Sequence, residues 1–258
     1  MIKLVASDLD GTLLLNGAQA LDERSVKAIR KLIDKGIYFA PASGRQIISL
    51  KRLFEPVGAE LIYIADNGSY VEYKGEQIAK TAIDRELGLK IIEDAYSLPN
   101  CEVMVSGVKA AYFKPKTKEY EHRMTEVVNY NIEYVDSYED IPEDMLKIAV
   151  CDLTGIDNSS DYLKKRWCDK AAGVVSGKLY MDFMDMSVSK GKAIRQIKEY
   201  FSLKDSECMA FGDNFNDCAM LDEVANSYVM ESAVSAVKAH GRYSCSCVAD
   251  VLERLVTS

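Results

Sequence analysis

The sequence predicts an α/β protein, in which a Rossmann-like core with a parallel sheet is interrupted by an inserted α+β domain. Near both ends of the chain, buried-strand patterns alternate with amphipathic helices, which is typical of βαβ units in a parallel sheet. In the middle, strands come in pairs with helices between them, which favours a mostly antiparallel sheet. The length of 258 residues is enough for about one to two domains, each with its own core.

The N-terminal segment begins with a βαβαβ pattern. The apolar run 2–6 predicts a buried strand, and 22–35 carries apolar residues at helical spacing before Gly36, which predicts a helix with a glycine stop. The next elements are a strand at 37–40, a short helix from Ile47 that ends before Pro56, a strand at 61–65 and a β-hairpin over 70–73 and 77–80. This alternation implies a parallel sheet with right-handed crossovers.

The rest of the chain divides into a segment with paired strands and a second alternating segment. Between Ile83 and Met184 we expect helices at 86–96, 118–129 and 159–170, and strands at 101–105, 110–113, 132–135, 146–151, around Val174 and at 179–183. From Ser189 on we expect helices at 192–201, 217–224, 234–240 and 248–255, and strands at 208–211 and 228–229. The predicted core domain is therefore 1–82 with 186–258, and the predicted inserted domain is 83–185.

The composition excludes several classes of protein. A net charge of −8 argues against a general nucleic-acid binder, which needs a basic face, and requires any phosphate site to be locally positive. No apolar run approaches the roughly 20 residues of a membrane span, and no leader pattern is present, so we expect a cytoplasmic protein without a membrane partner. The seven cysteines include no CxxC pair, which favours reduced thiols. A metal or redox role for the close pair Cys245 and Cys247 stays open, and no pattern specifies an oligomeric state.

Two carboxylates follow the first predicted strand, in Asp8-Leu9-Asp10-Gly11-Thr12. Residues at i and i+2 lie on the same side of an extended chain, and open α/β sheets bind ligands at the carboxyl ends of their strands. One carboxylate can attack phosphorus, while the other can protonate the leaving oxygen and then activate water. A turn with solvated acids is the alternative. A calcium loop is excluded, because Gln19 stands where its final glutamate should be.

Two further segments have the features of an anion site. Ala42-Ser43-Gly44-Arg45 follows the second predicted strand, and a hydroxyl, a glycine N–H and a helix N-terminus together can bind an anion. Lys190 lies in Ser187-Val188-Ser189-Lys190-Gly191-Lys192, which opens a predicted helix, and the macrodipole disfavours a cation at a helix N-terminus. A bound phosphate would explain Lys190, and a solvated lysine is the alternative.

The last candidate segment is Phe211-Gly212-Asp213-Asn214-Phe215-Asn216-Asp217, at the end of another predicted strand. A loop so rich in Asp and Asn can serve turn geometry alone. Its place at a strand's carboxyl end favours a site for a hard cation. Oxygen ligands from Asp8, Asp10 and Asp213, completed by water, suit Mg²⁺.

The order and placement of these four segments resemble the four motifs of the haloacid dehalogenase-like superfamily. More closely, the chain resembles the Cof-type phosphatases, whose large α/β cap is inserted between motifs two and three. The resemblance covers the whole chain. It implies a Mg²⁺-dependent phosphomonoester hydrolase that forms an aspartyl-phosphate, acts on small phosphorylated metabolites such as sugar phosphates or phosphorylated cofactors, and chooses its substrate through the cap.

The resemblance also implies roles for individual residues. Asp8 would be the nucleophile and Asp10 the general acid/base, and the Asp8 carboxylate, the Asp10 carbonyl and Asp213 would bind Mg²⁺. The residues that would contact the phosphoryl group are Leu9 and Gly44, through backbone N–H, together with Ser43, Lys190 and Asn216. Asp217 would orient Lys190 or a metal-bound water, and Arg45 and Asn67 would support the site.

Asp10 also bears on the type of reaction. By the resemblance, dehalogenases lack an acid at this place because a halide leaves without a proton, whereas an alkoxide needs one, so Asp10 favours phosphoester chemistry. Two alternatives stay open. A phosphomutase of the same superfamily would protect its phosphoenzyme from water and need a bisphosphate activator, and a catalytically inactive module would bind phosphate without releasing it.

Overall fold

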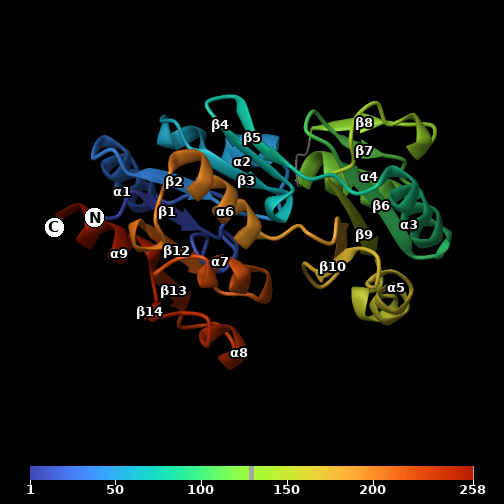
Figure 1. Ribbon diagram of the computed structural model, residues 1–258. Coiled ribbons are helices and arrows are strands. Elements are labelled where there is room, and N and C mark those ends of the chain that lie inside the picture. Colours follow the sequence, from blue (N-terminus) through green and yellow to red (C-terminus); the bar gives the residue numbers. More distant parts are fainter. Residues whose placement is uncertain (128–130, 258) are drawn as a thin grey trace. The chain divides into compact units, whose positions relative to one another are not determined.

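The structure is a computed structural model that describes residues 1–127 and 131–257 (Figure 1). By their contacts, the residues group into two compact units. The first comprises Met1–Arg45, Leu50–Lys80 and Ser189–Ser258, and the second comprises Gln46–Ser49 and Thr81–Val188. Gln46–Ser49, which the sequence assigned to the core, groups with the second unit, where the Gln46 Nε2 donates to the carbonyl of Gly107 at 3.2 Å.

The first unit is built on a parallel sheet. Its elements are β1 (Leu4–Ser7), α1 (Glu23–Asp34), β2 (Tyr38–Pro41), most of α2 (Ile47–Phe54), β3 (Ile62–Ala65), β4 (Tyr70–Tyr73), β5 (Glu76–Lys80), α6 (Lys190–Phe201), β12 (Cys208–Gly212), α7 (Cys218–Asp222), β13 (Asn226–Met230), α8 (Ser235–Lys238), β14 (Tyr243–Cys245) and α9 (Val248–Thr257). Five strands pair in parallel in the order β14-β13-β12-β1-β2. The strand order reverses between β1 and β12, so these two strands flank the point at which such sheets bind ligands.

Alternating side chains of this sheet enter two buried layers. Leu4, Ala6 and Ala210 join a cluster with Ile194 of α6 and Met220 of α7. The intervening side chains, such as the fully buried Phe39, point to the other face. That face is covered by α1, which packs against β2 and α9. The predicted parallel core of alternating strands and helices is therefore present.

The predicted third strand differs from the expectation in its partner. β3 forms a separate antiparallel sheet with β4 and β5, and it meets the parallel sheet at a single bridge between Ala42 and Ile64. The reason is the turn directly after β3. Asp66 and Asn67 have left-handed backbones, with φ of 46° and 57°, and the chain reverses there to pair with β3 from its other side.

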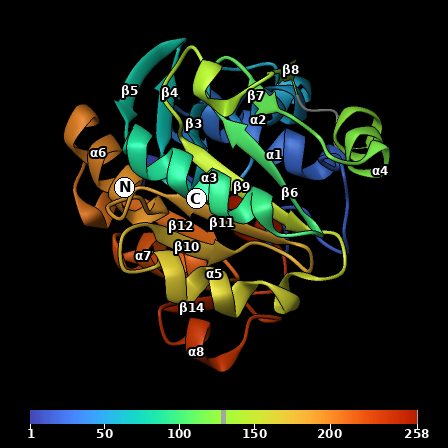
Figure 2. The same ribbon diagram turned by 90° about the vertical axis from the view of Figure 1, so that its right-hand side faces the viewer.

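The second unit is an α+β structure. Its elements are α3 (Arg85–Ser97), β6 (Cys101–Ser106), β7 (Ala111–Phe113), α4 (Lys118–His122), β8 (Ile132–Tyr134), β9 (Lys147–Asp152), α5 (Ser160–Trp167), β10 (Ala172–Val175) and β11 (Tyr180–Met184). The strands form one sheet in the order β10-β11-β9-β6-β7-β8, antiparallel except between β7 and β8. Figure 2 shows α3 and α5 on one face of this sheet.

The helices of the second unit cover its sheet through two apolar clusters. Ile91 of α3 and Trp167 of α5 join a cluster with Val150 and Phe183, and the Trp167 Nε1 donates to Asp94 of α3 at 2.7 Å. On the other face, Tyr120 of α4 packs with Met104, Phe113 and Met124. The antiparallel character expected for the middle of the chain is therefore correct.

Several element boundaries differ from the predicted ones. The predicted helix 118–129 is α4 followed by a π-helical turn over Arg123–Val127, and its predicted end at 128–129 lies outside the described residues. α5 ends at Trp167, α8 is a single turn, and β14 is a strand that no pattern predicted. Cys245 of β14 is buried, with its Sγ 3.8 Å from the Met230 sulfur. Within the described ranges, the structure holds no helix that is long and apolar enough to span a membrane.

Candidate active site

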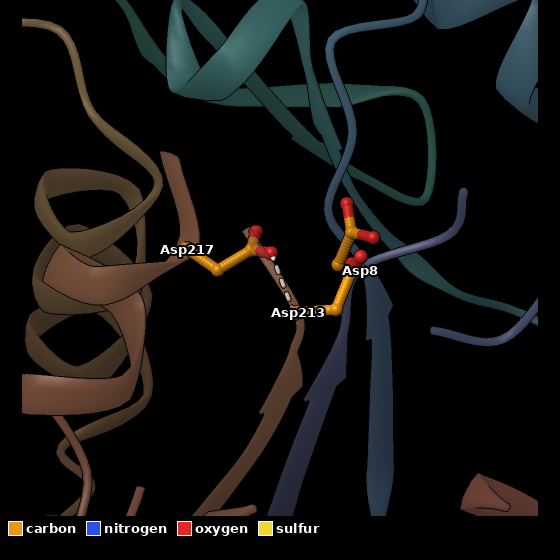
Figure 3. A group of neighbouring side chains, drawn as sticks. All are labelled: Asp8, Asp213 and Asp217. Carbon is orange, nitrogen blue, oxygen red and sulfur yellow. Dashed lines mark hydrogen bonds between the residues drawn. The ribbon is translucent and has the colours of Figure 1, made fainter. Parts of the chain in front are cut away.

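Asp8 and Asp213 lie at the ends of two adjacent parallel strands. Asp8 follows β1, and its N–H donates to the carbonyl of Phe211 in β12 at 2.9 Å. Asp213 follows β12 directly. Figure 3 shows the two carboxylates close together at this edge, with the carboxylate of Asp217 nearby. The sheet therefore brings together two acids that stand 205 positions apart, as the strand-end argument predicted.

The loop after β1 is shaped to lie against Asp213. Gly11 has a φ of +98°, and a Cβ on it would come within 2.4 Å of the Asp213 Oδ2. The Thr12 Oγ1 donates to the Asp213 Oδ1 at 2.8 Å. The fully buried Leu9 accepts the N–H groups of Thr12 and Leu14 at its carbonyl. Thr12 is thus a contact of Asp213 that the sequence analysis did not identify, although it belongs to the first motif.

Lys190 is the first residue of α6, and its side chain is fully buried. The Nζ lies 2.5 Å from the Asp8 Oδ1 and 2.6 Å from the Asp217 Oδ1. The alternative of a solvated lysine is therefore wrong. Two carboxylates offset the unfavourable position of this cation at a helix N-terminus, so its place there does not require a bound phosphate.

Asp217 is fully buried and fixes the loop after β12. Its Oδ2 accepts the backbone N–H groups of Asp213 and Asn214 at 3.0 and 3.1 Å, the first of which is drawn in Figure 3. Gly212 allows this closeness, because a Cβ there would lie 2.5 Å from the Asp217 Cβ. Asp217 therefore holds Lys190 with one oxygen and the backbone of Asp213 with the other.

Burial and charge act in opposite directions on these groups. Burial, with smaller repulsions from Asp217 and Asp213, raises the pKa of Asp8 to about 8 despite the attraction of Lys190. Burial also raises the pKa of Asp213, against the hydrogen bond from Thr12. Burial alone would lower the pKa of Lys190, but Asp217 and Asp8 outweigh it and raise this pKa above its ordinary value. The site thus has more carboxyl groups than its one buried ammonium can neutralise.

The second predicted segment lies beside Asp10. Ser43 is 2 % exposed, and its Oγ accepts the N–H of Arg45 at 3.2 Å. The guanidinium of Arg45 donates to both carboxylate oxygens of Asp10, from Nε at 3.2 Å and from Nη2 at 2.6 Å. This two-point contact fixes the plane of the Asp10 carboxylate. The resemblance implied a supporting role for Arg45, and no sequence pattern indicated that Asp10 is its partner.

Asn216 reaches the site from the 3-10 turn Phe215–Asp217. Its Nδ2 donates to the Oδ1 of Asn67 at 3.1 Å, and the three atoms nearest to a Cβ on Gly44 all belong to the Asn67 side chain. The structure therefore gathers every candidate site residue into the first unit, on the loops that follow β1, β2, β3 and β12 and at the start of α6.

The acidic side chains fit a hard divalent cation. Oxygens of Asp8, Asp213 and Asp217 lie within 4.8 Å of one another. All three donors are carboxylate oxygens, which Mg²⁺ prefers. Because both oxygens of Asp217 already accept hydrogen bonds from Lys190, Asp213 and Asn214, Asp8 and Asp213 are the better ligands of the three.

Residues 5–250 match the family described as haloacid dehalogenase-like hydrolase. The chain belongs to this family. The structural likeness agrees, since the crystal structure of a Streptococcus mutans UA159 protein superposes over 100% of both chains with a TM-score of 0.86 and 26% identity. The haloacid dehalogenase-like fold of this chain, a parallel-sheet core with an additional α+β unit, therefore extends over its whole length.

Two relatives in this family carry the same functional name. The 5-amino-6-(5-phospho-D-ribitylamino)uracil phosphatase YbjI of Escherichia coli (strain K12) is 28% identical over 262 residues, covering 99% of this chain and 96% of its own. The phosphatase of the same name YwtE of Bacillus subtilis (strain 168) is 24% identical over 265 residues, covering 92% and 90%. The haloacid dehalogenase-like hydrolases similar to this chain along its length thus include named phosphatases.

Proposed function

We propose that this protein is a Mg²⁺-dependent phosphomonoester hydrolase that works through an aspartyl-phosphate on Asp8. One observation carries the proposal: Asp8 is buried at the strand end where the sheet order reverses, with Lys190 on one side, Asp213 beside it and the Arg45-held Asp10 two residues on. A carboxylate nucleophile, an acid/base and a cation-binding acid thus meet within one loop cluster. Family membership supports the hydrolase class.

The reaction has two steps that follow from these residues. In the first, an Asp8 carboxylate oxygen forms a bond to phosphorus while the bond from phosphorus to the ester oxygen breaks, and Asp10 gives its proton to that leaving oxygen. In the second, Asp10 takes a proton from water, whose oxygen attacks phosphorus, and the bond to Asp8 breaks to release phosphate. Asp10 thereby returns to its protonated form.

Charge stabilisation accounts for most of the rate. Phosphomonoester hydrolysis is accelerated by up to about 10²¹-fold in enzymes, and general acid–base catalysis supplies about 10²–10⁴ of this. Mg²⁺ held by the Asp8 carboxylate, the Asp10 carbonyl and Asp213 would neutralise charge on the phosphoryl oxygens. Lys190, Ser43, Asn216 and the backbone N–H groups of Leu9 and Gly44 would donate to those oxygens. Together with Mg²⁺, these groups would offset the net charge of −8.

The substrate that we propose is a small phosphorylated metabolite. The functional names of the relatives support this class, because both describe a phosphorylated ribitylaminouracil. We assign substrate choice to the inserted domain predicted at 83–185, with the core at 1–82 and 186–258. The division of the residues into two compact units supports this assignment, although Gln46–Ser49 groups with the second unit.

The test measures phosphate release from a panel of phosphomonoesters, with Mg²⁺ and with a chelator. We expect turnover with Mg²⁺, its loss on chelation, its abolition in Asp8→Asn, and a fall of about 10²–10⁴ in Asp10→Asn. Asp34→Asn, an exposed acid of α1, is the matched control and should keep wild-type turnover.

Two other outcomes would overturn the proposal. Turnover that appears only with a bisphosphate activator would identify a phosphomutase. Phosphate binding without release from any monoester would identify an inactive binding module.

A further inference from the structure

A short turn outside the four motifs connects three of the loops that form the site. Asp66 and Asn67 follow β3 directly, and both have left-handed backbones, with φ of 46° and 57°. Two consecutive non-glycine residues in this region are strained, and such strain persists where the surroundings hold it in place. The contacts of the turn identify what holds it.

The backbone of the turn binds the loop of Ser43 and Arg45. The N–H of Asp66 donates to the carbonyl of Arg45 at 3.0 Å, and the N–H of Asn67 donates to the carbonyl of Ser43 at 2.9 Å. On its other side the turn meets α6, because a Cβ on Gly68 would lie 2.4 Å from the carbonyl oxygen of Ser189. The turn therefore fills the space between the loop of Ser43 and Arg45 and Ser189, which is the N-cap residue of α6.

The Asn67 side chain also contacts the loop that follows β12, through Asn216. It is 5 % exposed, its Oδ1 accepts from the Asn216 Nδ2 at 3.1 Å, and its amide lies against Gly44, where a Cβ would come within 3.2 Å of the Asn67 Nδ2. A single amide thus touches two of the loops that we propose to contact the phosphoryl group. A side chain at position 44 would therefore require this amide to shift by a few tenths of an ångström.

With the Asn67 Oδ1 facing Asn216, the hydrogen bond between the two asparagines sets the orientation of the Asn216 amide. A primary amide has an acceptor oxygen on one side and an NH₂ group with two N–H donors on the other. With Asn67 accepting one N–H, the second N–H of Asn216 is available to an anionic oxygen. The reversed amide would place its carbonyl oxygen against the Asn67 Oδ1, and two acceptors repel each other.

We infer that Asn67 is a positioning residue, which orients the Asn216 amide so that its second N–H donates to a phosphoryl oxygen. The inference rests on the proposed function of the site. The left-handed backbone at Asn67 is what brings its side chain between Gly44 and Asn216, so the strain of the turn serves the placement of this amide.

The kinetic test uses Asn67→Gly, Asn216→Ala and the double variant. Glycine keeps the left-handed backbone without strain and removes the amide. We expect each single variant to lower kcat by about tenfold with a smaller effect on KM, because the lost contact strengthens in the transition state. The double variant should fall within about twofold of Asn216→Ala. Ser202→Gly, a left-handed and exposed site at the end of α6, is the matched control and should keep wild-type kcat.

A second measurement does not depend on turnover. The side-chain amide signal of Asn216 in nitrogen-15 NMR, assigned by its loss in Asn216→Ala, should shift in Asn67→Gly and stay in place in Ser202→Gly. If Asn67→Gly does not fold, Asn216 is changed instead to test the contact between the two amides. In that case Asn216→Asp should shift the side-chain amide signal of Asn67. Inorganic phosphate titrated with Mg²⁺ should bind more weakly to Asn67→Gly, or to Asn216→Asp in that case.

These results separate the two proposals. An unshifted Asn216 signal, full kcat in Asn67→Gly, or additive losses in the double variant would each overturn the role of Asn67, whatever the wild type hydrolyses. A wild type that binds phosphate without hydrolysing any monoester would overturn the proposed function, and the NMR shift with weaker phosphate binding would then still support the role of Asn67.

Discussion

The ammonium group of Lys190 lies 2.5 Å from a carboxylate oxygen of Asp8, although the two residues stand 182 positions apart in the chain. The Nζ of Lys190 also lies 2.6 Å from the Asp217 Oδ1. Because all three side chains are nearly or fully inaccessible, each charge depends on the others for compensation. Removing Lys190 leaves both carboxyl groups buried without their counter-charge, which is more costly than the intact group is stabilising.

Replacing Lys190 by Met should therefore destabilise the fold as well as the reaction. Methionine has a similar shape without the charge, so Asp217 would remain buried without the ammonium that its Oδ1 contacts. We expect a loss of about 3–5 kcal/mol in the free energy of unfolding at pH 7, measured by denaturant titration.

The loss should grow as the pH rises above about 8, because Lys190 lowers the pKa of Asp8. Without Lys190 the folded protein keeps this proton to higher pH, where the unfolded chain has already lost it. Lys27→Met, which removes an exposed ion pair with Glu23, is the matched control and should change stability by less than about 0.5 kcal/mol. An equal loss in both variants would contradict the role given to the buried group.

Binding of Mg²⁺ should release protons and strengthen with rising pH. Burial raises the pKa of Asp8 to about 8, so this carboxyl is mostly protonated at pH 7, and a cation binds its ionised form. We expect the apparent affinity to rise from pH 6 to pH 8, by at most about tenfold per unit, and to level off above. Calorimetry in buffers with different ionisation enthalpies counts the released protons.

In Asp8→Asn most of that proton release should disappear. An affinity for Mg²⁺ that stays constant between pH 6 and pH 8 in the wild type would contradict a ligand role for Asp8, which must lose its proton to bind the cation.

Arg45→Lys should lower kcat more than it raises KM. Arg45 contacts both oxygens of Asp10, and the ammonium of a lysine cannot reproduce this fork. Misplacing the acid/base lowers the rate of the reaction by up to about 10²-fold. Steady-state kinetics with a phosphomonoester measures this effect. Combined with Asp10→Asn, Arg45→Lys should cause little further loss. Independent losses would show that Arg45 acts on the substrate instead of through Asp10.

Gly212→Ala should impair the site through Asp217. The added methyl carbon would lie 2.5 Å from the Asp217 Cβ, so this side chain must move away from the N–H groups of Asp213 and Asn214. We expect kcat to fall by about tenfold or more, with weaker Mg²⁺ binding measured by calorimetry. Gly177→Ala, at an open position of the second unit where the nearest atom lies 4.0 Å away, should leave both values unchanged.

Local patterns predicted the elements and the strand ends well, because apolar periodicity and strand-end acids are properties of neighbouring residues. Ile62–Ala65 has a clear strand pattern, but its antiparallel partner depends on the left-handed turn at Asp66 and Asn67, which the sequence Asp-Asn-Gly indicates as a turn without giving its direction. The strand Tyr243–Cys245 was missed because three residues are too few to show a period.

Long-range contacts were the part that sequence reasoning did not supply. The order of the motifs placed Lys190 near an anion, and the structure gives it two carboxylates from distant loops. The pairing of Arg45 with Asp10 and of Asn216 with Asn67 likewise depends on how loops 35 and 149 positions apart meet. No spacing within a segment carries that information.

The position of β1 in the middle of the parallel sheet has a consequence for biosynthesis. β1 pairs with β2, which follows soon after it, and with β12, which begins only at Cys208. At about 5–20 residues per second, the ribosome needs roughly ten to thirty seconds between these two partners. During that interval one edge of an apolar strand is unpaired, and such an edge is a template for pairing with other chains. The newly made N-terminal segment therefore passes through an aggregation-prone stage before its catalytic aspartate can be enclosed.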